Sequence, residues 1–455
     1  MNESGGGSGL KPTLNFPGVL GQSIASIGLT ASVAVNIPII YGIAGAGTWI
    51  TYLVATVAIL LVALNINQFA GKFASSGGLS VFVKESLGPW AGIMTAWALT
   101  LAYVIVGMCV LAGFSESVHA MFQHLHLPFH SAVFYVLCMA ACTTLACWEV
   151  RFSALLMLVT EVLSVTVITI LCFIILKRHG FTVDFSQITL QGVSFSGVRS
   201  GLVLAVLSFT AFESATTLGN ETNNPLKTIP RAVFIAPLVA GIFFIFAAYV
   251  LALAFHSSPV SILTSDDPLE LLARQMGLAD FAVWIAFGAS VCFFGAALAN
   301  LTAAARIIFF LARKGYLPKE LAVVHKRGTP QTALITAGLL GAIGAMTFAF
   351  TGCKSMELFN YTGTVATFGF LVAYFLVSIG APIYLYRQGE LTILTLLVSV
   401  LSALFLLFVA VGSIYPVPPG PEKYLPLIFL GLFVGGGIVF TSIYRFSNAG
   451  NHDGG

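Results

Sequence analysis

Two acidic residues fall inside long apolar runs, and they are the residues of this chain best suited to chemistry. Glu213 lies in the middle of one run and Glu161 lies within an earlier one. A charged side chain at mid-bilayer costs about 2.5–3.5 kcal/mol on insertion scales, so such residues persist when they face a cavity or a partner. No Lys or Arg lies at comparable depth in these two runs. The pair therefore predicts proton-carrying carboxyls, and the alternative is two permanently protonated groups that brace neighbouring helices.

The composition explains why two carboxyls stand out so clearly. Of the 455 residues, 58% are hydrophobic and 8% are charged, against roughly 25% charged in soluble domains. A soluble chain of this size could not stay in solution with so few charges, whereas a chain surrounded by hydrocarbon needs no more. The composition therefore predicts a membrane protein, and the net charge of +3 gives no sign of a nucleic-acid partner.

Twelve apolar runs are long enough to cross a bilayer, which takes about 20 residues. Backbone groups in lipid must be hydrogen-bonded within their own segment, so we expect an all-α polytopic membrane protein. The predicted spans cover residues 17–43, 46–70, 89–118, 130–148, 153–176, 198–219, 230–256, 279–311, 331–350, 356–382, 391–413 and 424–445.

Residues 14–447 are expected to form one transmembrane domain, because the loops between the spans are too short for a soluble domain. Residues 1–13 and 448–455 are polar and are expected to be disordered tails. Most of the 20 Lys and Arg residues fall in cytoplasmic loops if the N-terminus is inside. The positive-inside rule then predicts a multi-pass protein of the cell (plasma or inner) membrane with both termini in the cytoplasm.

Four histidines in one outer loop resemble a metal cluster at first sight. No carboxylate or thiol lies at ligand spacing around them, so we interpret them as incidental and expect neither a metal nor a cofactor. They are His119, His124, His126 and His130.

The first and sixth spans differ in composition from the others, since they carry small and hydroxyl residues where a plain membrane anchor carries Leu and Val. Span one holds Ser26, Gly28, Ser32 and Asn36, and span six holds the run 207–219. The two spans occupy corresponding places if the first ten spans form two groups of five. A matched pair of interrupted segments is the best sequence indication of a transporter site. The alternative is that the small residues only allow close helix packing.

Two motifs resemble the amino acid/polyamine/organocation (APC) transporter superfamily. The run Ser208–Ala215, followed by Asn224–Arg231, is similar to the sixth span and next loop of that family. The run Arg306–Pro318, with His325–Pro330, is similar to the end of the eighth span and its loop. The resemblance covers the whole chain as a twelve-span pattern. It implies a LeuT-type fold with inverted repeats at about 17–176 and 198–382, and peripheral helices at about 391–445.

The same resemblance implies a substrate held between spans one, three, six, eight and ten. By position, the family's substrate-carboxylate signature falls on Ala31, Ser32 and Val33. The span-six substrate backbone falls on Phe209, Thr210 and Ala211, and the gating glutamate falls on Glu213. Three further residues are expected to line the pocket by their place beside these segments: Ser26, Tyr103 and Phe212.

This chain departs from the family pattern at three places. The usual Gly-Ser-Gly is Ala31-Ser32-Val33, which crowds the exposed amides, so we expect substrate choice to differ here. Positions that supply sodium-binding hydroxyls in some relatives are Phe294 and Gly295. Proton-coupled relatives can carry a Lys in span five near the place of Glu161. The resemblance with these departures implies a transporter of amino acids or small amines working by alternating access, with a coupling proton at Glu161 or Glu213.

Several other functions are compatible with the same residues. The chain could be an uncoupled exchanger, or it could carry a non-amino-acid solute or an inorganic cation on the same fold. A more remote alternative is a membrane sensor that binds a ligand without transport. An enzyme is not expected, because the spans hold no Ser–His pair, no H-E-x-x-H and no paired aspartates. We expect a monomer or a homodimer.

Overall fold

The computed structural model describes residues 9–124, 127–256, 265, 267–415, 417 and 420–449. Within these ranges the chain is helical, and the β-structure there is one isolated bridge between Leu14 and Thr222. Eleven stretches of the described chain have the length and hydropathy of a membrane crossing. The first of them, Phe16–Ala70, contains two spans. This confirms an all-α polytopic membrane protein with about twelve spans.

Ten of the spans are single helices and two are interrupted. Span one consists of α1 (Phe16–Ile27) and α2 (Leu29–Ala44), and span six consists of α9 (Phe195–Leu207) and the 3₁₀-helix η2 (Phe212–Leu218). The uninterrupted spans are α3 (Thr48–Ala70), α5 (Pro89–His124), α6 (Ser131–Trp148), α7 (Val150–Arg178), α10 (Pro225–Phe255), α13 (Ala279–Arg313), α14 (Gln331–Phe350), α15 (Ser355–Gln388), α16 (Ile393–Gly412) and α17 (Leu425–Ala449).

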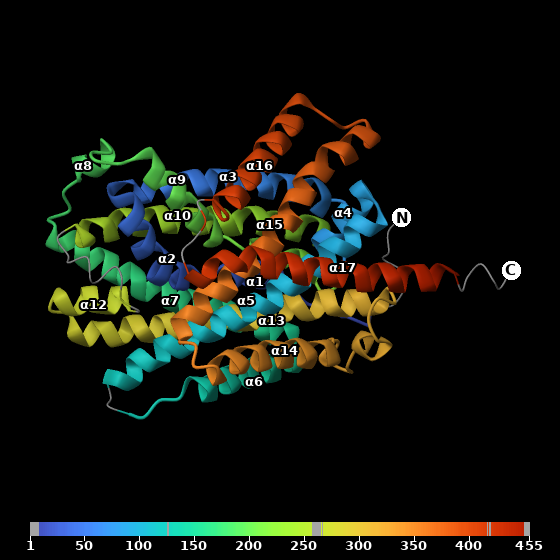
Figure 1. Cartoon of the computed structure of the whole chain (residues 1–455), viewed down its shortest axis with the longest axis horizontal. Helices are drawn as coiled ribbons and strands as arrows, with labels where there is room; N and C mark the ends of the chain where they lie inside the picture. Colours follow the sequence, from blue (N-terminus) through green and yellow to red (C-terminus); the bar gives the residue numbers. More distant parts are fainter. Residues whose placement is uncertain are drawn as a thin grey trace.

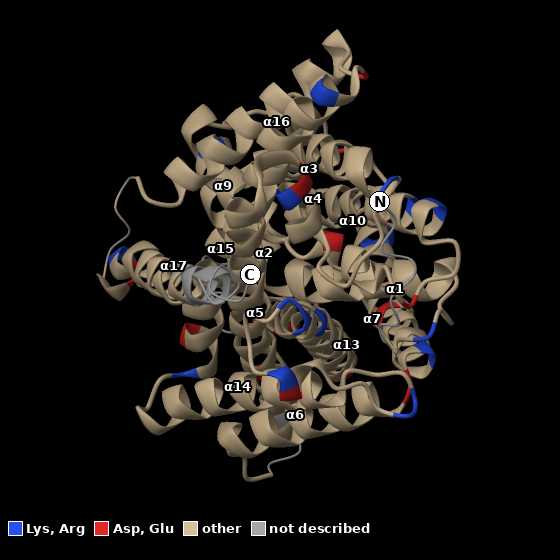
Figure 2. Ribbon diagram, turned by 90° about the vertical axis from the view of Figure 1, so that its right-hand side faces the viewer, with Lys and Arg blue, Asp and Glu red and all other residues tan. Residues whose placement is uncertain are grey.

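Short helices in the connections mark the two ends of the bundle. The long helices lie roughly along the long axis of the molecule, and both termini lie at the same end (Figure 1). We call this the terminal end, and we call the opposite end, where α8 and α12 lie, the α12 end. Figure 2 looks onto the terminal end, and charged segments are sparse among its helices. The short helices are η1 (Gly45–Gly47), α4 (Leu79–Leu87), α8 (Phe185–Ile188), α12 (Pro268–Gln275), η3 (Lys319–Ala322) and η4 (Gly420–Tyr424).

Spans two to four pack against spans seven to nine in the same order, which is the pattern expected if spans one to five and six to ten are two related groups. In the order of the spans, α3 packs against α10, α5 against α13, and α6 against α14. The contact of α5 with α15 has its counterpart in the contact of α13 with α7. Helices α16 and α17 lie outside this set, and the Leu side chains on α16 that face away from the protein suit a lipid-facing surface.

A buried ion pair lies near the terminal end of the bundle. Arg306 forms one half of this pair, and its side chain is only 2% exposed. Its Nε donates to Oε2 of Glu221 at 2.5 Å and its Nη2 donates to Oε1 at 2.9 Å. The third guanidinium nitrogen, Nη1, donates to the carbonyl of Thr302 at 2.8 Å. The fold brings the loop after η2 against α13. Arg306 therefore pairs with a residue that is distant in the sequence and could not be identified from it.

The same loop holds the segment before α1. The backbone N–H groups of Thr13 and Leu14 both donate to the carbonyl of Glu221 at 2.9 Å, and the N–H of Asn223 donates to the carbonyl of Leu14 at 2.8 Å. Leu10 is also buried, so this part of the expected tail contacts the rest of the protein. Residues 1–8 and 450–455 lie outside the described residues, so the disorder expected for the two tails stays a prediction there.

Removing one partner of the buried pair should destabilise the protein strongly, because the other charge stays buried without a counter-ion. For Arg306→Met we expect a loss of about 3–5 kcal/mol, and for Arg306→Met with Glu221→Met a recovery of most of that loss. The apparent melting temperature of the purified protein in detergent measures both effects.

The matched control is Lys72→Met, which removes the ion pair between Lys72 and Glu390 at the surface, where the two side chains are 33% and 55% exposed. Exposed pairs contribute about 0–1 kcal/mol, so this variant should melt close to the wild type. Equal shifts for Arg306→Met and Lys72→Met would contradict the structural role of the buried pair.

Candidate functional site

The interruption of span one is a single left-handed residue. Gly28 has φ 66° and ψ 71°, and it ends α1 and begins α2. Its carbonyl still accepts the N–H of Ser32 at 3.0 Å, so α2 is regular from its first turn. The turn leaves the first N–H groups of α2 without helical partners, which is the arrangement that favours anions at a helix N-terminus.

Span six is interrupted over a longer stretch. Helix α9 ends at Leu207, and Ala211 has φ 67°, a left-handed conformation that is uncommon for a residue other than glycine. The chain then continues as the tight helix η2. The prediction that spans one and six are both interrupted is confirmed.

The two interrupted segments touch each other through polar groups. The hydroxyl of Ser32 donates to the carbonyl of Ser208 at 3.4 Å, and the side-chain amide of Asn36 donates to the hydroxyl of Ser208 at 2.8 Å. Tyr52 of α3 lies beside the same hydroxyl, at 3.1 Å. Ser208 therefore connects α2, α3 and the break in span six.

Glu213 is held on both sides by tyrosines. Tyr103 of α5 donates to its Oε1 at 2.7 Å, and the hydroxyl of Tyr374 on α15 donates to its Oε2. The hydroxyl of Tyr374 also accepts the N–H of Ala211 at 3.0 Å, at the left-handed residue of the break. The carboxyl thus joins η2 to α5 and α15, and both of its oxygens have partners.

Glu161 has a different environment, at the break in span one. Its Oε1 accepts the thiol of Cys292 on α13 at 3.4 Å, while its Oε2 is buried and has no hydrogen-bond partner among the described residues. The backbone N–H of Leu29, the first residue of α2, also points to this carboxyl. Cys292 in turn accepts the N–H of Ala31 at 3.4 Å. Glu161 therefore lies at the N-terminal end of α2, where a negative charge is favoured.

The structure places the residues of the family signature just after the break. Ala31, Ser32 and Val33 lie in the beginning of α2 and not in the left-handed turn, which is made by Gly28. Ser26 lies in the last turn of α1. These positions are nearly devoid of exposed surface, so the site is enclosed by protein in this state.

The span-six residues expected in the site are also enclosed, apart from Thr210, which is partly exposed. The ring of Phe209 packs edge-on against Phe244 with centroids 5.1 Å apart, and the ring of Phe212 lies 5.2 Å from Tyr374. The ring of Phe212 therefore packs against one of the two tyrosines that hold the Glu213 carboxyl. The role of the span-six residues in binding substrate stays a prediction.

Three residues of the site were not predicted from the sequence. Cys292 and Tyr374 lie in ordinary apolar runs, and their types gave no signal. Gln22 is an amide inside an apolar run, and this could have been noticed. Its side chain donates to the carbonyl of Ala299 at 2.8 Å and accepts the hydroxyl of Thr302 at 3.0 Å, so it fixes α1 to α13.

The α13 residues nearest the break carry no hydroxyl. A Cβ built on Gly28 would lie 3.7 Å from the methyl carbon of Ala296 and 3.8 Å from the sulfur of Cys292. The sequence comparison with sodium-binding relatives points to Phe294 and Gly295, which also lack a hydroxyl. These two residues lie within one helical turn of Cys292 and Ala296 on α13. The four histidines were expected in one outer loop, and this is wrong for His119, which lies inside α5 with its Nδ1 3.4 Å from Oε1 of Glu116. His126 lies outside the described residues.

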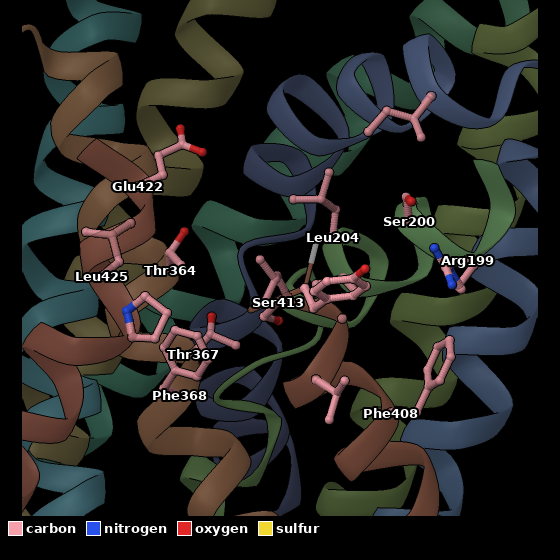
Figure 3. A pocket seen from close by; sticks show the side chains of 17 residues that line it. Arg199, Ser200, Leu204, Thr364, Thr367, Phe368, Phe408, Ser413, Glu422 and Leu425 are labelled. Atoms are coloured by element: carbon pink, nitrogen blue, oxygen red, sulfur yellow. The ribbon is translucent and has the colours of Figure 1, made fainter. Parts of the chain in front are cut away.

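A cavity of about 470 Å³ lies apart from this site, toward the α12 end. It is bounded by α9, α15, α16 and the start of α17, and its walls are mainly apolar (Figure 3). In this view Thr364, Thr367 and Glu422 lie on one side, and Arg199 and Ser200 lie on the other. None of the residues that the sequence predicts for the site lines this cavity.

Comparison with known proteins gives consistent results along most of the chain. The family model described as "Amino acid permease" matches residues 18–443. The branched-chain amino acid permease BcaP of Bacillus subtilis is 24% identical over 370 residues, which cover 76% of each chain. The low-affinity putrescine importer PlaP of Escherichia coli is 27% identical over 327 residues, covering 69% of this chain and 70% of that protein. A D-serine/D-alanine/glycine transporter of Escherichia coli is 24% identical over 323 residues, covering 69% and 67%.

The left-handed turn at Gly28 should tolerate no side chain. Alanine at this position is expected to lose about 1–2 kcal/mol, because its Cβ approaches the following carbonyl in the left-handed region. We therefore expect Gly28→Ala to lower both the melting temperature in detergent and solute uptake into proteoliposomes.

Gly42→Ala is the control on the same span. Gly42 lies inside α2, and a Cβ built there meets no atom within 4 Å. This variant should keep wild-type stability and uptake. If both variants behave alike, the backbone turn at Gly28 is not the feature that the site depends on.

Proposed function

The chain belongs to the amino acid permease family, and from that premise we propose that it is a secondary active transporter of amino acids or related small amines. It works by alternating access in the cell membrane with both termini in the cytoplasm, and a proton at Glu161 couples it to a gradient. Relatives named for branched-chain amino acids, putrescine and small D-amino acids support the substrate class. The observation that carries the coupling is the position of Glu161 at the interruption of span one.

The paired interruptions support binding of a molecule that carries both charges. N–H groups freed at the start of α2 favour a carboxylate, and carbonyl groups in the irregular part of span six favour an ammonium group. The hydrogen bond between Ser32 and Ser208 shows that these two segments meet. An amino acid bridging them would replace contacts that the protein makes with itself in this state.

Protonation of Glu161 changes how α2 is held. As a carboxylate, Glu161 is attracted to the positive end of α2 at Leu29, and it accepts a hydrogen bond from Cys292. A proton on the carboxyl removes the charge that makes this attraction strong. The unpartnered Oε2 provides a place for that proton without breaking an existing hydrogen bond. The half-helix α2 is then freer to move relative to α7 and α13.

We assign Glu213 a different role. Its two oxygens already accept hydrogen bonds from Tyr103 and Tyr374, so its carboxylate is stabilised within a closed set of partners. Because these partners come from α5 and α15, Glu213 acts as a clamp that keeps η2 against both helices. Opening a path along span six requires these hydrogen bonds to break.

Replacing the Glu161 carboxyl should separate transport from the proton gradient. In proteoliposomes, we expect wild-type uptake of radiolabelled leucine or putrescine to increase when the outside is acidic. Glu161→Gln should abolish this dependence while still binding substrate, as measured by a ligand-induced rise in melting temperature.

Glu149→Gln is the control, because Glu149 is exposed and lies just before the same helix, α7. It should keep the pH dependence of the wild type. Uptake that follows a sodium gradient and ignores a pH gradient would overturn proton coupling. Counterflow of labelled solute without gradient-driven accumulation would instead identify an uncoupled exchanger, and ligand binding without any flux would identify a sensor.

A further inference from the structure

Besides Glu161, Glu213 and Glu221, another carboxyl is buried at the α12 end of the bundle. Glu270 is in the first turn of α12, and only 8% of its surface is exposed. No hydrogen bond or ion pair from another described side chain reaches its carboxyl, and the groups that favour the carboxylate are its own backbone N–H and the nearby charge of Arg274. A buried carboxyl without a partner is costly, so this side chain needs an explanation.

The carboxyl of Glu270 lines a cavity of about 610 Å³ between α12, the end of α5 and the start of α13. Gln123 of α5 and Arg274 of α12 add polar groups to its wall, and Ala282 and Ala286 of α13 form an apolar face. Cavities of roughly 300–1,000 Å³ that combine apolar walls with a few fixed polar groups are typical of small-molecule sites.

The charges around this cavity favour a cation. Burial, together with the neighbouring carboxyls of Asp267 and Glu116, raises the pKa of Glu270 to about 8, while Arg274 opposes this shift. Glu116 lies beside His119. Of the elements packed against α12, α2 has no charged residue, and α13 contributes only the exposed Asp280 near this end. The surroundings thus supply more negative than positive charge.

We infer that this cavity is a second binding site for a small protonated amine, with Glu270 as its counter-ion and the alanine face of α13 receiving the alkyl part. The inference rests on the proposed function for its link to transport. The site lies at the end opposite both termini, and α12 also contacts α2, the half-helix that responds to Glu161. An amine arriving from the α12 end would meet this site before the enclosed central one.

Binding of an amine here should depend on pH in a defined direction. Glu270 is mostly protonated below its pKa of about 8, whereas an alkylamine keeps its proton up to about pH 10. The cation favours the carboxylate, so its binding at pH 7 releases a proton from Glu270. Affinity should therefore rise from pH 6 to pH 8 and level off above that.

The test uses purified full-length protein and putrescine as the probe, with leucine as a ligand of zero net charge. Isothermal titration calorimetry at pH 7 in buffers of different ionisation enthalpy measures the protons released. We expect proton release with wild type and none with Glu270→Gln, together with about tenfold weaker putrescine binding, since the ammonium group loses a charged hydrogen-bond partner. Leucine binding should not change.

Asp280→Asn is the matched control, because this exposed carboxylate starts α13 without lining the cavity. It should bind putrescine as the wild type does. In proteoliposomes, Glu270→Gln should raise the KM for putrescine about tenfold while kcat holds. If Glu270→Gln does not fold, two other results test the site. Proton release by the wild type and retained putrescine binding by Glu270→Asp would both support it.

The outcomes separate this inference from the proposed function. Unchanged putrescine affinity and KM in Glu270→Gln, or no proton release by wild type at pH 7, would overturn the amine site even if the protein transports amines. Displacement of putrescine by equal concentrations of K⁺ would also overturn it, because the site would then be one for any cation. Putrescine binding with proton release, but no flux of any amine or amino acid, would overturn the proposed function and leave this site standing.

Discussion

The structure depends on one constraint, which is that a backbone N–H or C=O freed inside the membrane must find another partner. Hydrocarbon offers none, and each unsatisfied group costs several kcal/mol. The interruptions at Gly28 and at Ser208–Ala211 free such groups, and side chains of other spans meet them. Cys292 accepts the N–H of Ala31, and Tyr374 accepts that of Ala211. The irregular backbone is therefore possible only because intact helices surround it.

The same partners give the two membrane carboxyls different properties. Both carboxyl oxygens of Glu213 accept hydrogen bonds, one from Tyr103 and one from Tyr374. Glu161 accepts a weak hydrogen bond from a thiol beside the N–H of Leu29, and its Oε2 has no hydrogen-bond partner among the described residues. A group with unused hydrogen-bonding capacity can accept a proton at less structural cost than a group whose partners must all rearrange. This difference is the physical basis for assigning coupling to Glu161 and clamping to Glu213.

Charges at the two ends of the bundle have opposite arrangements. At the terminal end, Arg306 and Glu221 satisfy each other, and the loop of Glu221 also holds the segment before α1. These contacts therefore join the segment before α1, the loop after η2 and α13. At the α12 end, Glu270 faces a cavity, and no side chain in the described part of the protein forms an ion pair with it. The buried charge is therefore paired at one end of the bundle and faces a cavity at the other.

The sequence by itself determined that the protein lies in a lipid bilayer, which segments span it, and which two spans are interrupted. A chain with few charges and long apolar runs is stable only in a bilayer. Small polar residues in spans one and six weaken the helix at those positions, whatever surrounds them. It could not determine partners, because these come from distant segments. Cys292 lies 131 residues from Glu161, and Arg306 lies 85 residues from Glu221. Only the packing of α2 against α7 decided that Glu161 meets a helix end, and only the packing of α13 against η2 decided that Arg306 is buried. Hydrogen bonds require proximity in space and not along the chain.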